Sequence, residues 1–155
     1  MDFKLSQRSL SRLEGVHPDM VAIVKRAIEI TDVDFGVSQG VRTLAQQKEY
    51  VRTGKSQTMN SKHLPQSDGY SHAVDVVAYI GGDVAWELNL YDNIADAFKR
   101  AAQELGVSIK WGAAWNVPDM TKWDGTMEEA MMHYVDTRRK EGRRPFIDGP
   151  HFELS

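Results

Sequence analysis

The chain has 155 residues, of which 41% are hydrophobic and 26% charged, and its formal net charge at pH 7 is -3. This composition is ordinary for a folded globular protein, so we expect a single domain over residues 1–155 rather than a disordered or membrane-embedded chain. The small negative charge argues against a protein that binds nucleic acid. No cysteine is present, which excludes disulfides, thiolate zinc sites and cysteine nucleophiles. Any metal ion must therefore be held by His, Asp or Glu.

The N-terminal segment, residues 1–20, lacks the apolar core of a secretory signal. No uninterrupted apolar run approaches the length needed to cross a membrane. We therefore expect a protein without a signal peptide that is made in the cytoplasm and has no stable membrane association.

Periodicity predicts the secondary structure in chain order. Apolar residues at helical spacing predict helices at 6–13, 17–31, 43–54, 89–106 and 126–140. Runs of β-branched and aromatic residues predict strands at 34–43, 72–80, 107–115 and 150–154, and the polar segment 55–70 predicts a loop. Helices and strands are mixed without strict alternation, which favours an α+β fold in which a small antiparallel sheet is flanked by helices.

Three residues could form a metal site together. A hydrolytic zinc site needs three protein ligands and one open position, and the helical motif HExxH is absent. The candidates are His63 in the polar loop, Asp75 in the next strand and His151 at the start of the last strand. An aspartate inside so apolar a strand must be paired, hydrogen-bonded or metal-bound.

His72 is the alternative to His63. It lies three residues before Asp75, and this odd spacing on a strand directs it to the opposite face of the sheet. We therefore favour His63 as the ligand and expect His72 to line a cleft or lie at the surface. Asp148, three residues before His151, could act as a general base on a water molecule near the metal.

Five short motifs suggest a family. In chain order, "QGVRT", "SKH", "AVD", "WGAAWN" and "DGPHFEL" resemble the phage L-alanyl-D-glutamate endopeptidases, relatives of the D-Ala-D-Ala carboxypeptidases and of the hedgehog fold. The resemblance runs from residue 18 to residue 154. It implies a zinc enzyme that cuts the stem peptides of peptidoglycan, with the hedgehog/D-Ala-D-Ala-peptidase-like fold of these relatives.

The resemblance also assigns roles to particular residues. It implies one zinc ion on His63, Asp75 and His151, with Asp148 as the catalytic carboxylate. Arg42 matches the arginine that these enzymes direct at the substrate carbonyl or carboxylate, a role suited to a fixed forked cation. Ser61, the first residue of the S-x-H motif, is expected with Arg42 on the substrate side of the site.

Two departures from the family pattern stand out. Eleven residues separate His63 from Asp75, and Ser71 stands where the family has glycine, so we interpret residues 64–72 as a loop insertion. Ala114 occupies a position at which many relatives have a carboxylate, so any supporting role of that group must be filled otherwise.

The biology implied by the resemblance is phage lysis. A monomeric endolysin without a separate wall-binding domain would accumulate in the host cytoplasm and reach the periplasmic wall once another protein opens the inner membrane. Two alternatives stay open at this stage: a D-Ala-D-Ala carboxypeptidase or dipeptidase with the same zinc site, and a zinc-binding module of this fold without catalysis. By analogy with some relatives, the acidic stretch 119–129 is a candidate site for a regulatory calcium ion, although it contains no recognisable loop motif.

Overall fold

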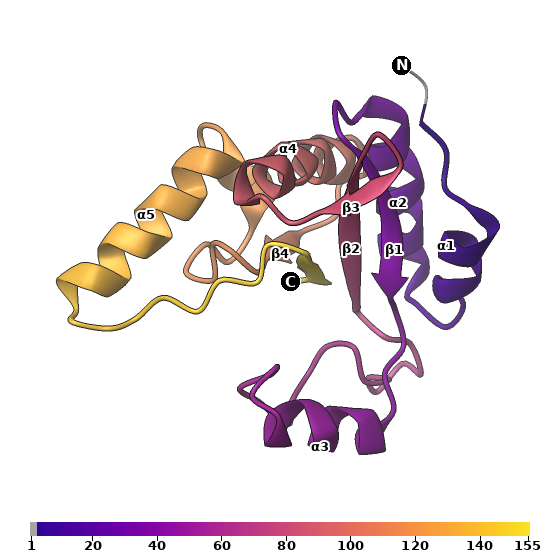
Figure 1. The fold of residues 1–155 in the computed structure, drawn as a ribbon, viewed down its shortest axis with the longest axis horizontal. Helices are drawn as coiled ribbons and strands as arrows, with labels where there is room; N and C mark the ends of the chain where they lie inside the picture. The colour runs from indigo at the N-terminus through magenta and orange to yellow at the C-terminus, as the bar shows by residue number, and fades with distance from the viewer. Residues whose placement is uncertain (1–2) are drawn as a thin grey trace.

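The computed structural model describes residues 3–155, which form a small sheet with helices around it (Figure 1). The helices are α1 (Gln7–Arg12), α2 (Pro18–Ile30), α3 (Leu44–Arg52), α4 (Leu88–Leu105) and α5 (Met127–Lys140), with a 3-10 turn, η1 (Met120–Lys122). The strands are β1 (Asp34–Gln39), β2 (Ala73–Ile80), β3 (Asp83–Ala85), β4 (Ile109–Trp111) and β5 (His151–Leu154).

The sheet is antiparallel at every pairing. Its order is β1-β2-β5-β4, and the short strand β3 also pairs with β2. The C-terminal strand β5 therefore lies between β2 and β4, and its register sets Asp75 directly opposite His151. These pairings confirm the predicted α+β fold with a small antiparallel sheet.

The two faces of the sheet differ in their surroundings. Along β2, Val74, Val76 and Ala78 are fully buried in the main hydrophobic core, which also contains the apolar residues of α2 and α4. Because side chains alternate along a strand, Asp75 lies on the opposite face. In β5 the same alternation buries Phe152 in the core. One face thus carries the core, and the other is available for chemistry.

The predicted helix ends agree with the local chemistry of the chain. Thr43 caps α3 and Thr126 caps α5, each in a capping box with a Gln or Glu three residues later. Gly106 ends α4 with a φ of 69°, a left-handed conformation that glycine adopts without steric cost. These caps satisfy backbone groups that a helix leaves without partners at its ends.

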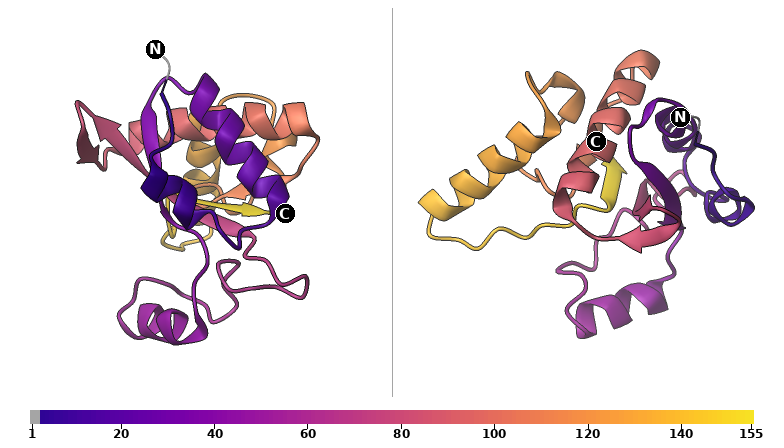
Figure 2. Two further views of the ribbon diagram at one scale, coloured as in Figure 1. Left: turned by 90° about the vertical axis from the view of Figure 1, so that its right-hand side faces the viewer. Right: turned by 45° about the horizontal axis from the view of Figure 1, so that its top comes forward.

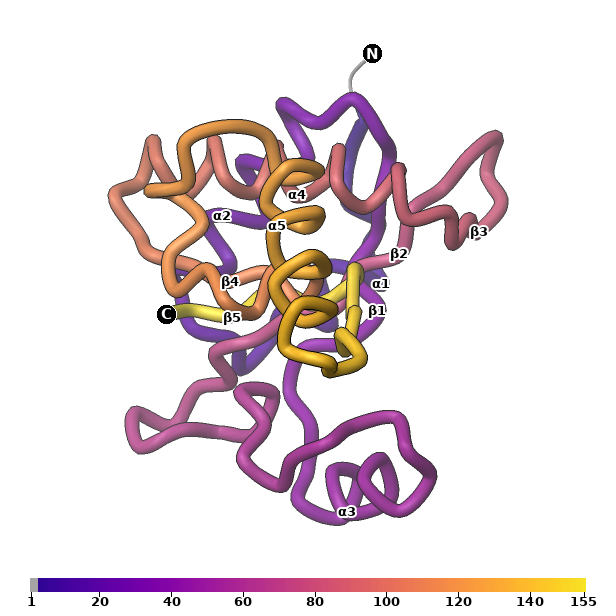
Figure 3. Tube along the Cα trace, turned by 90° about the vertical axis from the view of Figure 1, so that its left-hand side faces the viewer, coloured from indigo at the N-terminus to yellow at the C-terminus, as the bar shows by residue number. Residues whose placement is uncertain are grey.

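Two segments project from the sheet and the core helices. The helix α3 and the irregular chain that follows it lie below the sheet, and Figure 2 shows them apart from α2 and α4. The helix α5 packs beside α4, and an extended segment runs back from its end to β5 (Figure 3). The functional face of the sheet therefore lies between a lobe built around α3 and a wall built around α5.

The structure differs from the predicted elements in three places. The strand predicted at 34–43 ends at Gln39. The strand predicted at 107–115 stops at Trp111, because the backbone of Gly112 pairs with His151 and Asp148 instead of continuing the ladder, and the chain then turns. The short strand β3 and the turn η1 were not predicted. Within residues 3–155, no helix combines the length and the hydrophobicity that crossing a membrane requires.

Candidate metal centre and its cleft

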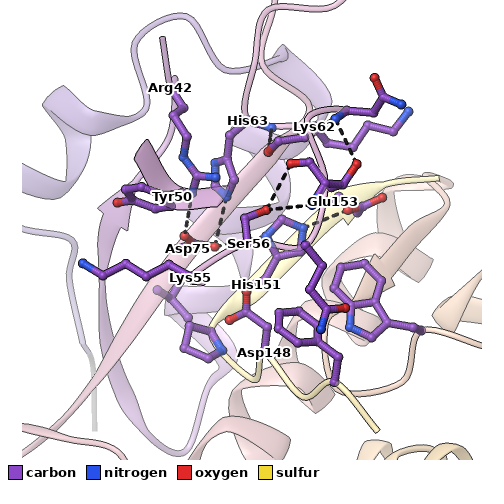
Figure 4. A pocket seen from close by; sticks show the side chains of 18 of the residues that line it. Arg42, Tyr50, Lys55, Ser56, Lys62, His63, Asp75, Asp148, His151 and Glu153 are labelled. Carbon is purple, nitrogen blue, oxygen red and sulfur yellow. Dashed lines mark hydrogen bonds and ion pairs between the residues drawn. The ribbon is translucent and has the colours of Figure 1, made fainter. Parts of the chain in front are cut away.

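Three side chains meet on the functional face of the sheet. The Asp75 Oδ1 atom lies 3.1 Å from His63 Nε2 and 3.1 Å from His151 Nδ1. One ligand atom from each residue lies within 4.8 Å of the other two. The close-up of the site shows the three side chains next to one another (Figure 4). The structure thus brings together the three residues that the sequence predicts as metal ligands.

Two of these residues are placed by the sheet and the third by a loop. Asp75 and His151 face each other across the β2–β5 pairing. His63 is 1% exposed, and its backbone is held by hydrogen bonds from Arg42 N to its carbonyl and from its own N–H to Ser61 Oγ. Ser61 therefore shapes the turn that directs His63 inward, and it also lines the cleft.

The second nitrogen of each imidazole has an acceptor outside the metal centre. His63 Nδ1 lies 2.8 Å from the carbonyl oxygen of Gly40, and His151 Nε2 lies 2.8 Å from Glu153 Oε1. A nitrogen that donates to such an acceptor carries the ring's proton, which leaves the other nitrogen's lone pair free to bind a metal. Gly40 must be glycine because a Cβ there would lie 2.2 Å from the carbonyl oxygen of Arg12.

The charges of the centre are strongly coupled. Burial alone would raise the pKa of Asp75, but the positive charges and hydrogen bonds of His63 and His151 hold it well below its usual range. Burial alone would lower the pKa of His151, but its hydrogen bonds to Asp75 and Glu153 raise it to about 10. Without a metal ion, His151 is therefore protonated at neutral pH.

These residues fit a divalent metal ion. Two imidazole nitrogens and one carboxylate oxygen are a common ligand set for catalytic metal sites, which keep a further position open. Each imidazole already has the outer hydrogen bond that orients metal-binding histidines. The site also opens on a cleft of about 680 Å³.

Asp148 lies beside His151 in the lining of the cleft (Figure 4). Its N–H donates to the carbonyl of Gly112, and its own carbonyl accepts from the N–H of His151, which makes a tight turn immediately before β5. Burial, and then the negative charge of Asp75, raise the pKa of the Asp148 carboxyl. A raised pKa suits a carboxylate that has to accept a proton.

The guanidinium group of Arg42 is fixed by several contacts within the protein. Its two terminal nitrogens donate to Gln47 Oε1 and Gln39 Oε1, both at 2.6 Å, and the guanidinium carbon lies 4.1 Å from the centre of the Tyr50 ring. One of these nitrogens is also 3.6 Å from Asp75 Oδ2. Arg42 is 4% exposed, so only a small part of its side chain reaches the surface of the cleft. Its main contact in the centre is the ion pair with the Asp75 carboxylate.

The two walls of the cleft differ in character. One wall is polar and comes from α3 and the chain after it, including Lys55, Ser56 and Lys62. The other wall is aromatic: Trp115, Tyr134 and Phe146 come from α5 and its neighbouring loops, and Trp86 comes from the chain between β3 and α4. A cleft with both apolar surface and several polar groups is typical of sites for small or extended organic ligands.

His72 lies away from the metal centre. Its Nε2 atom is 2.7 Å from Asp68 Oδ2, and its ring packs edge-on against His17, which caps α2. His72 directly precedes β2, on the side of the strand opposite to Asp75. It therefore ties the 64–72 loop to the start of α2.

Several contributors to the site were not singled out from the sequence. Glu153 had a local signal, since it lies two residues after His151 and must share its face of β5. Gly112, by contrast, stands in the quoted motif "WGAAW" without any sign of its contact with Asp148. The partners of Arg42, which are Gln39, Gln47 and Tyr50, also carry no signal in the sequence.

The acidic stretch proposed for calcium is used for capping. Asp119 accepts from Thr121 and Ser108 around η1, and Glu129 completes the capping box of α5. Among residues 3–155, the His63, Asp75 and His151 group is the one whose ligand atoms converge as a metal site requires. The calcium site stays a prediction.

A His-Asp-His donor set beside a half-buried carboxylate, on the open face of a small sheet, is an arrangement that metal-dependent hydrolases use. The model of the phage L-alanyl-D-glutamate peptidase family matches residues 1–155. A relative from Escherichia phage T5, an L-alanyl-D-glutamate peptidase, is 33% identical over 158 residues, which cover 99% of each chain. The chain therefore belongs to the phage L-alanyl-D-glutamate peptidase family.

A solved structure agrees with this assignment. The L-Ala D-Glu endopeptidase ChiX of Serratia marcescens is similar with a TM-score of 0.71 and 37% identity, over 98% of this chain and 90% of that one. The vancomycin-resistance D,D-dipeptidase VanXYg shows a weaker likeness, with a TM-score of 0.38 and 14% identity over 88% of this chain and 47% of that one. The fold is thus the fold of ChiX.

Proposed function

We propose that the protein is a zinc-dependent endopeptidase that hydrolyses the L-Ala–D-Glu bond of peptidoglycan stem peptides. The observation that carries this proposal is the convergence of His63, Asp75 and His151 beside Asp148, in the lining of a cleft large enough for a peptide. The names of the phage T5 relative and of ChiX supply the bond that is cut.

Zinc is the metal that this ligand set favours. Two histidines and one carboxylate, with an open fourth position, form a usual ligand set of zinc hydrolases, whereas magnesium and calcium prefer ligand sets made of oxygen. When bound, zinc supplies Lewis acidity, which lowers the pKa of a water molecule and polarises a carbonyl.

The protein's own residues perform the remaining steps. Asp148 accepts the proton of the attacking water and returns it to the leaving amine, which needs a carboxylate whose pKa is raised, as burial ensures in this site. Arg42 holds Asp75 in position through its ion pair. The part of Arg42 that lines the cleft also adds positive charge near the carbonyl oxygen of the substrate, which becomes negative during the reaction. Ser61 keeps His63 in its turn and borders the bound peptide.

The proposed biology is host lysis by a phage. An enzyme that cuts stem peptides must reach the periplasmic wall, and we propose that this chain acts as a monomer of one domain once the inner membrane has been opened. The family assignment supports a phage setting for this role.

The function is tested by digestion of purified peptidoglycan with the zinc-loaded protein, followed by mass spectrometry. We expect released stem peptides that begin at D-Glu, and metal analysis should find zinc in proportion to protein. Loss of a single terminal alanine would instead identify a D-Ala-D-Ala carboxypeptidase. Intact peptidoglycan after exposure to zinc-loaded protein would identify a binding module without catalysis.

A further inference from the structure

The substrate of the proposed reaction has a charge next to the bond that is cut. Glutamate has two carboxyl groups, and only one of them can continue the peptide chain. An L-Ala–D-Glu bond therefore has a second carboxyl group a few atoms from its nitrogen, which is a free carboxylate unless it is amidated. The cleft should provide a cation for this group, and the inference below rests on the proposed function.

Arg42 is not free to bind this substrate carboxylate. Its terminal nitrogens already donate to Gln39 and Gln47, and its ion pair is with Asp75. Its Nε atom is buried and has no hydrogen-bond partner in the described part of the chain. A substrate carboxylate that took Arg42 would have to displace at least one of these contacts, which hold the metal ligand Asp75 in place.

Two other cations of the cleft also have acidic neighbours. Lys62 lies close enough to Glu153 for its charge to act on that carboxylate. Arg138 has Glu141 at 3.9 Å and packs over the Tyr134 ring. Within residues 3–155, neither Lys55 nor Lys62 forms an ion pair with a carboxylate within 4.0 Å. They differ in the carboxylate nearby: the charge of Lys55 acts on the exposed Glu49, which is already paired with Arg52, whereas Glu153 supports His151.

The position of Lys55 is fixed by the network that holds Arg42. The N–H groups of Lys55 and Ser56 both donate to the carbonyl of Tyr50. Gln47, the partner of Arg42, donates to Ser56 Oγ at 3.0 Å. The Lys55 amine lies 5.6 Å from the centre of the Tyr50 ring, the same ring on which Arg42 stacks. Figure 4 shows Lys55 at the Tyr50 side of the metal centre.

We propose that Lys55 binds the free glutamyl carboxylate of the substrate and thereby selects stem peptides in which this group is not amidated. Lys55 lines the cleft beside Tyr50, its charge is not needed by a carboxylate that supports the metal centre, and its backbone is tied to the residues that position Asp75. An ammonium on a flexible stem can follow a carboxylate into place, whereas Arg42 is fixed.

The test compares two substrates and two variants. The substrates are a muramoyl peptide with D-Glu and its D-isoglutamine form, in which the free carboxyl is an amide. The wild-type protein should show a lower KM for the acid. In Lys55→Met the KM for the acid should rise about tenfold, because one charge-assisted hydrogen bond to the substrate is lost. The KM for the amide and the kcat should stay close to wild type.

Lys62→Met is the matched control, since it removes a cation from the same wall of the cleft but should leave the discrimination between the two substrates intact. Calorimetry with an acid analogue whose scissile amide is reduced to an amine gives a second readout, and we expect weaker binding by Lys55→Met alone. Melting temperatures close to wild type will show that both variants fold.

The outcomes separate the two proposals. If the wild-type protein cleaves both substrates with equal KM, or if Lys62→Met rather than Lys55→Met removes the discrimination, the assignment of Lys55 is wrong and the proposed function stands. If the zinc-loaded wild-type protein cleaves neither substrate, the proposed function fails, and the role of Lys55 fails with it.

Discussion

Each imidazole of the metal centre uses one nitrogen for the centre and the other for an acceptor outside it. For His63 the acceptor is the backbone carbonyl of Gly40, and for His151 it is the carboxylate of Glu153. The two acceptors differ in kind, because a carbonyl is neutral whereas Glu153 is charged. Glu153 therefore orients the ring of His151 and also increases the basicity of the nitrogen that faces the metal.

Glu153→Gln should weaken metal binding without removing it. The amide oxygen can still accept from His151 Nε2, but the negative charge is lost, so we expect zinc affinity to fall about 10–100-fold. A competition titration with a zinc chelator measures the change. Glu104→Gln, which removes a surface carboxylate paired with Arg26, is the control and should bind as wild type. Equal affinity in all three proteins would show that Glu153 does not tune the site.

The ligand assignment itself depends on His63 rather than His72. His63→Ala and His151→Ala should each lose stoichiometric zinc and peptidoglycan hydrolysis, because two ligands hold zinc far less tightly than three. His72→Ala should keep both, since its ring contacts Asp68 and His17 instead. Metal analysis and a turbidity assay on outer-membrane-stripped cells check this. Zinc loss in His72→Ala with retention in His63→Ala would overturn the site.

The metal-free protein should lose stability as the pH rises. His151 has an ordinary pKa of 6.5, which the folded metal-free protein raises to about 10. Its protonation therefore stabilises the fold fully below pH 6.5, and this contribution is lost as the pH rises toward 10. Urea unfolding at pH 7 and pH 10 measures the loss, with metal-free His151→Gln as the control. Equal pH dependence in the two proteins would contradict the raised pKa.

At the scale of elements, a single turn connects the centre to its proposed base. Gly112 follows β4 and forms backbone hydrogen bonds in both directions: its N–H donates to His151 and its carbonyl accepts from Asp148. A Cβ on Gly112 would lie 2.2 Å from the carbonyl oxygen of Asp148. The absence of a side chain at Gly112 thus allows β4 to hold the turn that carries both residues.

Gly112→Ala should displace this turn and lower kcat at least tenfold, because a shift of about 1 Å at a catalytic group can cost a hundredfold in rate. Gly36→Ala in β1 is the matched control. Its Cβ would meet the ends of the Ser9 and Tyr79 side chains at 3.0 Å, which can move, and it lies outside the cleft. Turnover on a muramoyl peptide, with melting temperatures for both variants, distinguishes them. A fully active Gly112→Ala would show that the turn tolerates the shift.

At the scale of the whole molecule, the aromatic wall of the cleft depends on how α5 is attached to α4. Tyr134 of α5 is 2% exposed and donates its hydroxyl to the carbonyl of Phe146, so it links α5 to the segment that leads to Asp148. On the α4 side of the contact, Asp92 is 5% exposed. Burial, and then the charges of Glu128 and Asp96, raise the pKa of Asp92 to about 6.

Asp92→Asn should stabilise the protein above pH 7. The folded-state pKa of about 6 exceeds the ordinary value of 3.8, so protonated Asp92 favours folding below pH 3.8, and this contribution is lost as the pH rises through 6. Removal of the charge should therefore add about 1–2 kcal/mol to the free energy of unfolding at pH 8. Urea titrations at pH 8 and pH 4 measure this gain, which should shrink at pH 4. A destabilised variant at pH 8 would contradict the raised pKa.

The sequence by itself determined the five α-helices, four of the strands and the face on which Asp75 lies. Helical spacing, capping residues and the alternation along β2 are local properties, and they act through the backbone within a few residues. The same alternation of side chains predicted His72 on the side of the strand opposite to Asp75, and this agrees with its contact to Asp68. The family motifs then pointed to His63, Asp75, His151 and Asp148 as one site.

Only the tertiary structure decided how these residues are supported. The pairing of β2 with β5 sets Asp75 opposite His151 across 76 positions of sequence, and the carbonyl that orients His63 belongs to Gly40, 23 positions away. The contacts of Arg42 with Gln39, Gln47 and Tyr50, and the fit of Gly112 against Asp148, depend on packing between segments rather than on periodicity. A sequence pattern records which face a side chain takes, but the partner it meets there is fixed only when separate elements pack together.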